Sequence, residues 1–183
     1  MWLSVFLGLL LGVLGIFAAP KTQELSRPKQ GAHEKALELT IRSDKRRYKK
    51  TDNIRVDVTL TNKNPAREMF VYGILGWGYR ASLTEIISDS TGKRVSPKII
   101  SEDLTPPISG NDMSLFVKLL PKHFLGTYLA EEISQLNISK PGKYSIVVEY
   151  HCPIGAADVN LAGFWSREDG VIRSNILLIE VVS

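Results

Sequence analysis

Cysteine and histidine are scarce in this chain, and the shortage excludes several kinds of site. Cys152 is the single cysteine, so an intramolecular disulfide cannot hold the fold together. The three histidines are His33, His123 and His151, and they lack the structured spacing of three or four zinc ligands. Because adjacent residues leave a strand on opposite sides, His151 and Cys152 predict neither a shared metal ion nor a Cys–His nucleophile.

Catalytic and cofactor motifs are also missing from the sequence. It contains no Asp-x-Asp-x-Asp-Gly calcium loop, no Gly-x-Ser-x-Gly motif, and no Walker or Rossmann glycine pattern. The acidic residues are scattered and form no convergent set of titratable groups. We therefore expect a protein that is not an enzyme, with no catalytic residues, no metal and no cofactor.

Charge is absent from the first apolar run, Trp2–Ala19. A helix of that length spans roughly 27 Å, just enough for the core of a bilayer. Residues 1–19 are interpreted as a signal peptide or a retained signal anchor. No Lys or Arg precedes the run. Phe17 or Ile16 would occupy the third position before a cleavage site, where a small residue is needed, so both alternatives stay open.

Residues 20–35 are polar and aperiodic, which is typical of a tether. Its cations would favour a cytoplasmic side by the positive-inside rule, but we expect the following domain, residues 36–183, to be exported, either membrane-anchored or secreted. That domain of about 150 residues is large enough for a core of its own. The hydrophobic fraction of 44% is ordinary for a globular protein, and the net charge of +4 permits contact with acidic surfaces without establishing it.

The segment Lys140–Tyr150 is the most informative stretch of the domain. A Pro-Gly turn runs directly into a strict alternation, with Tyr144 and Tyr150 on the same face as Ile146 and Val148. A period of two indicates a strand with one face against a core. Greek-key sandwiches place a tyrosine corner at such a position, where a tyrosine follows a tight turn.

Further strands are predicted from alternation and from apolar runs between turn signals. Residues 121–127 are expected to be irregular, Asp89–Gly92 a hairpin turn, and Trp77 a buried residue between the sheets, with a glycine-flanked bulge as the alternative. With about seven to nine short strands, the predicted fold is an all-β, immunoglobulin-like antiparallel β-sandwich with Greek-key connections, preceded by one N-terminal hydrophobic helix. The predicted strands are Leu37–Arg42, Ile54–Asn62, Met69–Leu75, Arg80–Ser88, Arg94–Ile100, Met113–Leu119, Lys143–His151 and Ile172–Val182.

Two local patterns carry a resemblance to known families. The segment Ser43–Val56 is similar to macroglobulin-type sandwich domains, in which a TDK-x-x-Y-K-P-G-x-x-V pattern joins the first two strands; Lys50-Thr51 stand here in place of Pro-Gly. The PKHFLGT segment and the late W-x-R-E-D-G loop resemble a group of exported bacterial Ig-like proteins with no assigned activity. Both resemblances imply a sandwich fold and no particular function.

The loop Cys152–Gly170 is the first candidate site. It is far longer than an ordinary hairpin loop, and loops of such length are often functional. Its residues Phe164, Trp165 and Arg167 belong to types that anchor protein interfaces, so we predict partner binding there. The alternative is that Phe164 and Trp165 fold back and cover the open end of the core.

A basic run is the second candidate site. Its cations predict contact with an anionic surface, such as lipid head groups or an acidic partner, while the alternative is a solvated hairpin turn. Tyr48, within the run, is expected to be a packing anchor, and no nucleic acid is predicted as a partner. The run comprises Arg42, Lys45, Arg46, Arg47, Lys49 and Lys50.

These patterns predict a non-catalytic binding or structural module at the cell envelope, held to the membrane by its N-terminal segment. Its partner would be an unknown protein or envelope component. The alternative function is proteinase inhibition, in which an extended loop enters a protease cleft. Ser101–Asp112 is the candidate loop for it, because Pro106-Pro107 would make the loop rigid.

Overall fold

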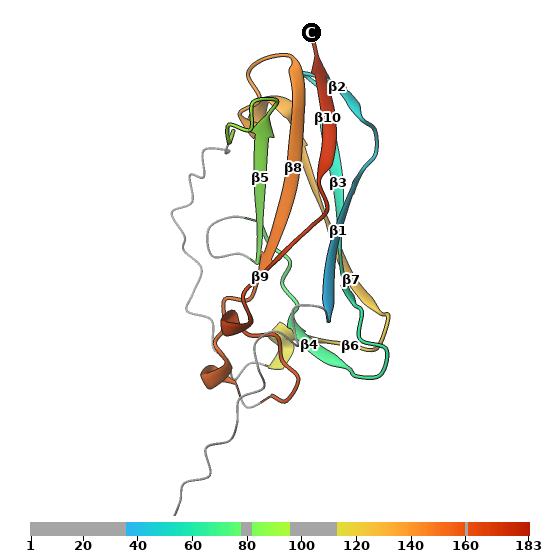
Figure 1. Ribbon diagram of the computed structural model, residues 1–183, viewed down its shortest axis with the longest axis vertical. Helices are drawn as coiled ribbons and strands as arrows, with labels where there is room; N and C mark the ends of the chain where they lie inside the picture. The colour runs from blue at the N-terminus through green and yellow to red at the C-terminus, as the bar shows by residue number, and fades with distance from the viewer. Residues whose placement is uncertain (1–35, 78–81, 96–112, 160) are drawn as a thin grey trace, which may run out of the picture.

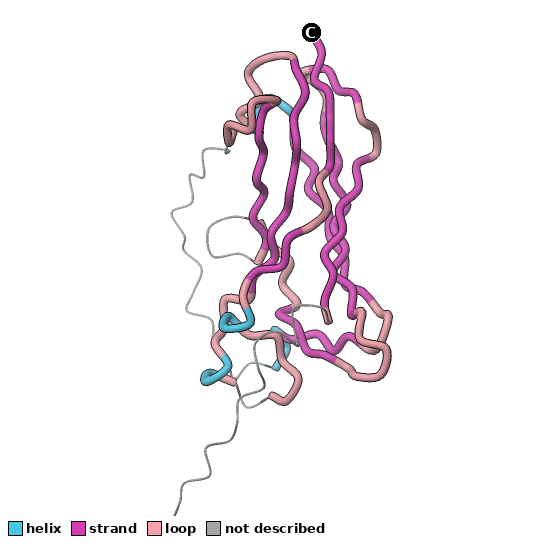
Figure 2. Tube along the Cα trace, in the orientation of Figure 1, coloured by secondary structure: helices cyan, strands magenta, loops and turns pink. Residues whose placement is uncertain are grey.

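The computed structural model describes residues 36–77, 82–95, 113–159 and 161–183. The predicted signal segment 1–19, the tether 20–35 and the candidate inhibitory loop Ser101–Asp112 lie outside the described residues. The described residues form ten strands and short 3-10 helices, so the prediction of an all-β fold is confirmed for this part of the chain. Figure 2 shows most of the strands running along the long axis of the molecule, with the short β4 and β6 lying across it.

The smaller of the two long sheets has the order β1-β3-β7 and is antiparallel throughout. β1 spans Leu37–Ser43, β3 spans Asn53–Asn62 and β7 spans Phe124–Glu132. In β3 the predicted alternation holds, since Ile54, Val56, Val58 and Leu60 are all buried. β1 and β3 therefore match the strands expected from their period of two.

β7 corrects the sequence prediction, because residues 124–127 were expected to be irregular. Instead, Phe124–Glu132 pairs along its length with β3. The strand was missed because its outer face is exposed and carries Phe124 and Tyr128, at 66% and 54% exposure. Apolar residues on the outward face hide the alternation, and pairing with β3 fixes a strand that its own sequence signals weakly.

The larger sheet has the order β2-β10-β8-β5, and β9 also pairs with β8. Its strands are β2 (Arg47–Lys49), β5 (Leu83–Asp89), β8 (Gly142–His151), β9 (Val171–Arg173) and β10 (Leu177–Val182). All pairs are antiparallel except β2 with β10, which is parallel. In Figure 1 this sheet lies in front of β1, β3 and β7.

β9 and β10 were predicted as one strand, and a bulge divides them. Arg173 pairs with Glu149 and Leu177 pairs with Ile146. The three residues 174–176 therefore face the two residues 147–148, so the later strand has one extra residue. Such a bulge bends a strand and changes the direction of its side chains.

A small sheet closes one end of the molecule. It contains β4 (Met69–Tyr72) and β6 (Phe116–Leu119), paired antiparallel. Trp77 lies just beyond β4; it is partly buried against the core and donates its indole N–H to the carbonyl of Tyr128 at 3.4 Å. The expectation of a fully buried tryptophan between the sheets therefore fits Trp77 only in part.

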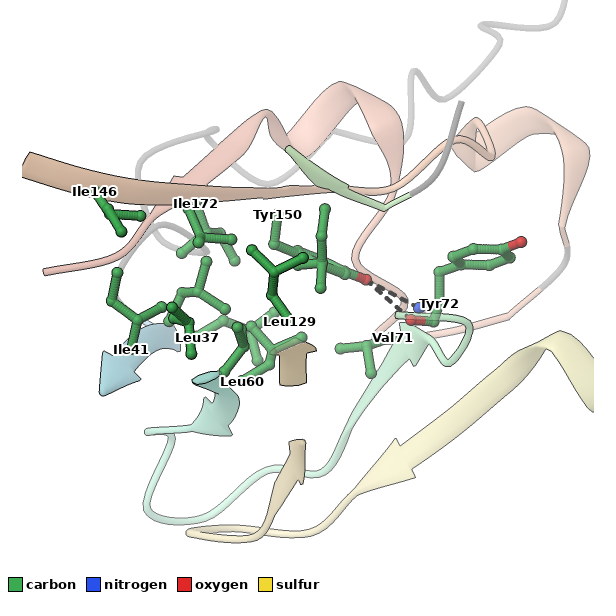
Figure 3. Packing of buried hydrophobic residues seen from close by; sticks show 14 of the residues in the cluster. Leu37, Ile41, Leu60, Val71, Tyr72, Leu129, Ile146, Tyr150 and Ile172 are labelled. Carbon is green, nitrogen blue, oxygen red and sulfur yellow. Dashed lines mark hydrogen bonds between the residues drawn. The ribbon is translucent and has the colours of Figure 1, made fainter. Parts of the chain in front are cut away.

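The core fills the space between the two long sheets. Figure 3 shows Ile146, Tyr150 and Ile172 on one side, facing Leu37, Ile41 and Leu60 on the other. Tyr144 at the start of β8 is buried, and its hydroxyl donates to the carbonyl of Lys140 at 2.7 Å. This is the backward hydrogen bond expected of a tyrosine corner.

Candidate functional site

The structure corrects the prediction that Phe164 and Trp165 form an exposed contact surface. Phe164 is 9% exposed and Trp165 is fully buried. The ring of Phe164 meets Phe116 edge-on, with 4.9 Å between centroids. The two aromatics thus cover the end of the core, which is the alternative that the sequence left open. The physical reason is that large apolar rings gain more from burial at this open end than from exposure.

The backbone of the same loop is fixed to β4. Phe70 N–H donates to Gly163 C=O and Trp165 N–H donates to Phe70 C=O, both at 2.9 Å. Gly163 has a φ of +74°, in the region that favours glycine, and so allows the turn before this pairing. The loop is therefore an ordered part of the fold.

Arg167, the third predicted contact residue, is exposed and lies among carboxylates of its own loop. Its guanidinium is 3.9 Å from Asp158 and 3.8 Å from Glu168. Glu168 in turn accepts the N–H of Ala156 at 2.7 Å, and this backbone hydrogen bond is the leading cause of its lowered pKa. Since these contacts join the 3-10 helices η4 (Ala156–Asp158) and η5 (Arg167–Asp169), Arg167 contributes to the order of the loop.

The side chains of the adjacent residues His151 and Cys152 lie in different environments, as expected for neighbours on opposite sides of a strand. Cys152 is buried, and burial raises the pKa of its thiol to about 12. His151 is half-buried, and burial lowers the pKa of its imidazole. In the part of the chain that the structure describes, no three His, Cys, Asp or Glu side chains gather in a group that could hold a metal ion.

The basic run is organised around Tyr48, which is buried as predicted. Its hydroxyl donates to Asp44 Oδ1 at 2.6 Å and also lies 2.8 Å from the carbonyl of Lys45. Burial and the Asp44 hydrogen bond raise the pKa of Tyr48 to about 12. Burial alone would raise the pKa of Asp44, but hydrogen bonds from Tyr48 and the backbone outweigh it and lower that pKa.

The cations of the run fall into different environments. Lys45 pairs with Asp52 at 2.7 Å and lies over the ring of Tyr48, and Arg47 is 3.6 Å from Glu180. Lys49 and Lys50 are exposed near the turn that precedes β3. Arg42 and Arg46 make no ion pair with any other described residue. These two arginines therefore belong to the positive charges of the run that no described carboxylate neutralises.

Arg42 and Arg46 line a groove of about 740 Å³. The groove lies where the chain leaves β1 in the smaller sheet and crosses to β2 in the larger sheet. Its other wall is the bulge and the start of β10. In Figure 1 the chain runs from β1 to β2 along one side of β10. The lining residues are Thr40–Arg46 and Asn175–Leu178.

Asn175, in the bulge, lines the groove and also contacts β1. Its side-chain Oδ1 accepts the N–H of Ile41 at 2.8 Å, and its Nδ2 donates to the carbonyl of Ile41 at 3.2 Å. The side-chain amide of Asn175 thus makes the two hydrogen bonds to Ile41 that a neighbouring strand would otherwise make. The bulge residue thereby joins the edge of the smaller sheet to the larger one.

Two apolar side chains stand exposed beside the arginines. Ile176 and Leu178 are 65% and 66% exposed. Sequence reasoning missed them because Ile176–Ile179 is apolar at every position, so alternation cannot show which residues face outward. The clue that was available is the length of this run, since one face of a sheet buries only every second residue.

Comparisons with known proteins add little to this geometry. No family model and no curated protein matches the chain. Among solved structures, it is similar to the β-glucosidase from Listeria innocua in complex with glucose, with a TM-score of 0.34 and 12% identity over 80% of this chain and 16% of that chain. The same enzyme with isofagomine gives a TM-score of 0.35 and 13% identity over 79% and 16%. The chain thus spans a small share of those enzymes, and likeness at this level carries no argument about function.

The described residues also bear on membrane insertion. None of their helices is long and apolar enough to span a bilayer. The predicted signal segment, residues 1–19, lies outside that search, so its role stays a prediction.

Proposed function

We propose that the protein is a non-catalytic immunoglobulin-like binding module of the cell envelope. The strand order supports this fold. An Ig domain places strands A, B and E in one sheet and C, F and G in the other. If β1, β3 and β7 are A, B and E, then β5, β8 and β10 follow as C, F and G, in the observed sheet order. The hydroxyl of Tyr144, at the start of strand F in this assignment, makes the corner hydrogen bond.

The groove at the β1–β2 crossing is the binding surface in this proposal. The main observation is that this groove combines Arg42 and Arg46, which make no ion pair with another described residue, with the exposed apolar Ile176 and Leu178. Its volume of about 740 Å³ falls in the range of ligand sites. The earlier hypothesis of contact through Phe164 and Trp165 is replaced, because both rings are buried.

The rest of the proposal follows the sequence. Residues 1–19 export the domain or hold it to the membrane, and the partner is a protein or another envelope component. The anionic contact expected of the basic run is assigned mainly to Arg42 and Arg46, because Lys45 and Arg47 already have acidic neighbours and Lys49 and Lys50 do not line the groove. Proteinase inhibition through Ser101–Asp112 gains no support from the described residues, which do not include that loop.

The experiment is affinity capture from the native envelope fraction with the tagged full chain in detergent. A groove variant, Arg42→Glu with Leu178→Ser, reverses one cation and removes one exposed apolar side chain. The matched control, Lys93→Glu with Phe124→Ser, makes the same two kinds of change on other surfaces; Phe124 and Leu178 are equally exposed, at 66%. Circular dichroism and thermal unfolding establish that all three proteins are folded.

The expected result is a partner retained by the wild type and the control and lost by the groove variant. Equal retention by all three proteins would contradict the groove as the binding surface. Loss with the control alone would instead assign binding to the surface around Lys93 or around Phe124. Turnover of a substrate by the wild-type protein, abolished by substituting a single residue, would contradict the non-catalytic class.

A further inference from the structure

The edge of β10 next to the groove has backbone groups that no other described residue pairs with. N–H and C=O groups of a paired strand point to its two neighbours in alternation. The N–H of Glu180 donates to Arg46 C=O at 2.8 Å, on the β2 side. The N–H and C=O of Leu178, two residues earlier, therefore point to the same side. There, β2 pairs only with Glu180, Val181 and Val182.

Within the described parts of the chain, neither backbone group of Leu178 has a hydrogen-bond partner. The pairing of β2 with β10 does not extend to this residue, and Leu178 and the crossing from β1 to β2 both line the groove. An open strand edge of this kind is a template for pairing with another extended chain. Strand addition at sheet edges is a recurring mode of peptide recognition.

The side chains around this edge indicate which side chains a bound peptide segment would need. Leu178 and Ile176 offer apolar contacts on the outer face. Arg42 and Arg46 offer positive charge from the opposite wall. Asp44 also lines the groove, but its carboxylate accepts hydrogen bonds from the Tyr48 hydroxyl and the Arg55 N–H. The net preference is for a segment with apolar and acidic side chains in alternation.

We propose that the groove binds an extended acidic–apolar peptide segment of a partner protein, which pairs through its backbone with the N–H and C=O of Leu178. This inference rests on the proposed binding function and specifies how the partner is held. An anionic membrane surface would use the same arginines but would leave the backbone of Leu178 unpaired. The two modes therefore differ at one identifiable amide.

The test begins with a displayed library of short linear peptides, selected against the folded full chain in detergent. The best binder is synthesised together with variants that are N-methylated at one backbone position each. N-methylation removes a donor and leaves every side chain in place. We expect selected peptides to alternate acidic and apolar residues, and methylation of the one peptide N–H that donates to the carbonyl of Leu178 to weaken binding by about tenfold. The folding of the protein is unaffected, because only the probe is changed.

A second readout is hydrogen exchange of the Leu178 amide, followed by NMR with and without the peptide. The expected result is exchange slowed by about tenfold or more for that amide. On the protein side, Arg42→Glu with Arg46→Glu is expected to weaken the peptide by about tenfold, while Lys93→Glu leaves it unchanged.

Several outcomes would overturn the inference. No enriched peptide, or a methylation scan without any sensitive position, would exclude strand addition. Unprotected Leu178 in the bound state would do the same. Stronger groove-dependent binding to phosphatidylglycerol vesicles than to the peptide would assign the arginines to a membrane. In each of these cases, a partner captured in a groove-dependent way would still support the proposed binding function, so the two failures are distinguishable.

Discussion

The side-chain amide of Asn175 hydrogen-bonds to both the N–H and the C=O of Ile41, a residue 134 positions earlier in the chain. The contact joins a bulge in the larger sheet to the edge strand of the smaller one. Both residues also line the groove. The side chain of Asn175 therefore contributes both to the stability of the fold and to the shape of the proposed site.

Asn175→Ala is expected to destabilise the fold by about 1–3 kcal/mol, because it leaves the N–H and C=O of Ile41 without their partner. Asn175→Asp keeps the acceptor for the N–H and loses the donor to the C=O, so its effect should be smaller. Urea unfolding of the two variants measures the difference. Equal stability of wild type and Asn175→Ala would show that the amide does not hold the two sheets together.

The buried hydroxyl of Tyr150 joins β8 to β4. It lies 3.1 Å from the N–H of Tyr72 and 3.4 Å from its carbonyl, as Figure 3 shows. Tyr150→Phe removes the partner of a buried N–H and should lower the free energy of unfolding by about 1–3 kcal/mol. Tyr144→Phe, which removes the corner hydrogen bond, should lower it by about 1 kcal/mol. If chemical denaturation gave the opposite order, the link between β8 and β4 would be weaker than its burial implies.

Trp165→Ala is expected to unfold the end of the core. Truncation of a fully buried tryptophan typically reduces stability by about 3–5 kcal/mol. Arg167→Ala, an exposed position in the same loop, should change stability by no more than about 1 kcal/mol. Thermal melting of both variants checks this contrast. A stable Trp165→Ala protein that had lost only its partner would restore the interface hypothesis for this loop.

The Asp44–Tyr48 hydrogen bond predicts a defined pH dependence. The pKa of Asp44 is lowered in the folded protein, so its carboxylate stabilises the fold above its unfolded pKa. That contribution disappears as the pH falls through the lower, folded pKa. The wild type should exceed Asp44→Asn in stability by about 1 kcal/mol near neutrality, and the gap should close below about pH 4. A gap independent of pH would mean that the charge of Asp44 is not responsible.

Cys152 should be inert in the folded protein. Its side chain is buried and its thiol pKa is raised to about 12, while thiol reagents attack the exposed thiolate. A disulfide reagent at pH 8 should therefore label the chain slowly in buffer and rapidly in concentrated urea. Fast labelling in buffer would require an open state of the β8 end that this structure does not contain.

Local pattern predicts much of this fold. The period of two fixes β1, β3 and β8, and the Pro-Gly turn before Tyr144 predicts the corner hydrogen bond that the structure contains. The Asp89–Gly92 turn is also confirmed, with Gly92 at a φ of +81° and Asp89 N–H bonded to Lys93 C=O. These features depend on neighbours within a few residues, so the sequence alone carries them.

Tertiary structure decided the rest. β7 exists because β3 pairs with it, and Phe164 and Trp165 are buried because Phe70 and Phe116 lie where the late loop passes. The sequence alone determined which segments are extended and where the basic run lies. Only the fold determined that Arg42 and Arg46 would stand beside Ile176 and Leu178. The reason is physical: side-chain alternation is a local property of the chain, whereas the pairing of strands and the place of a bulge depend on residues far apart in sequence.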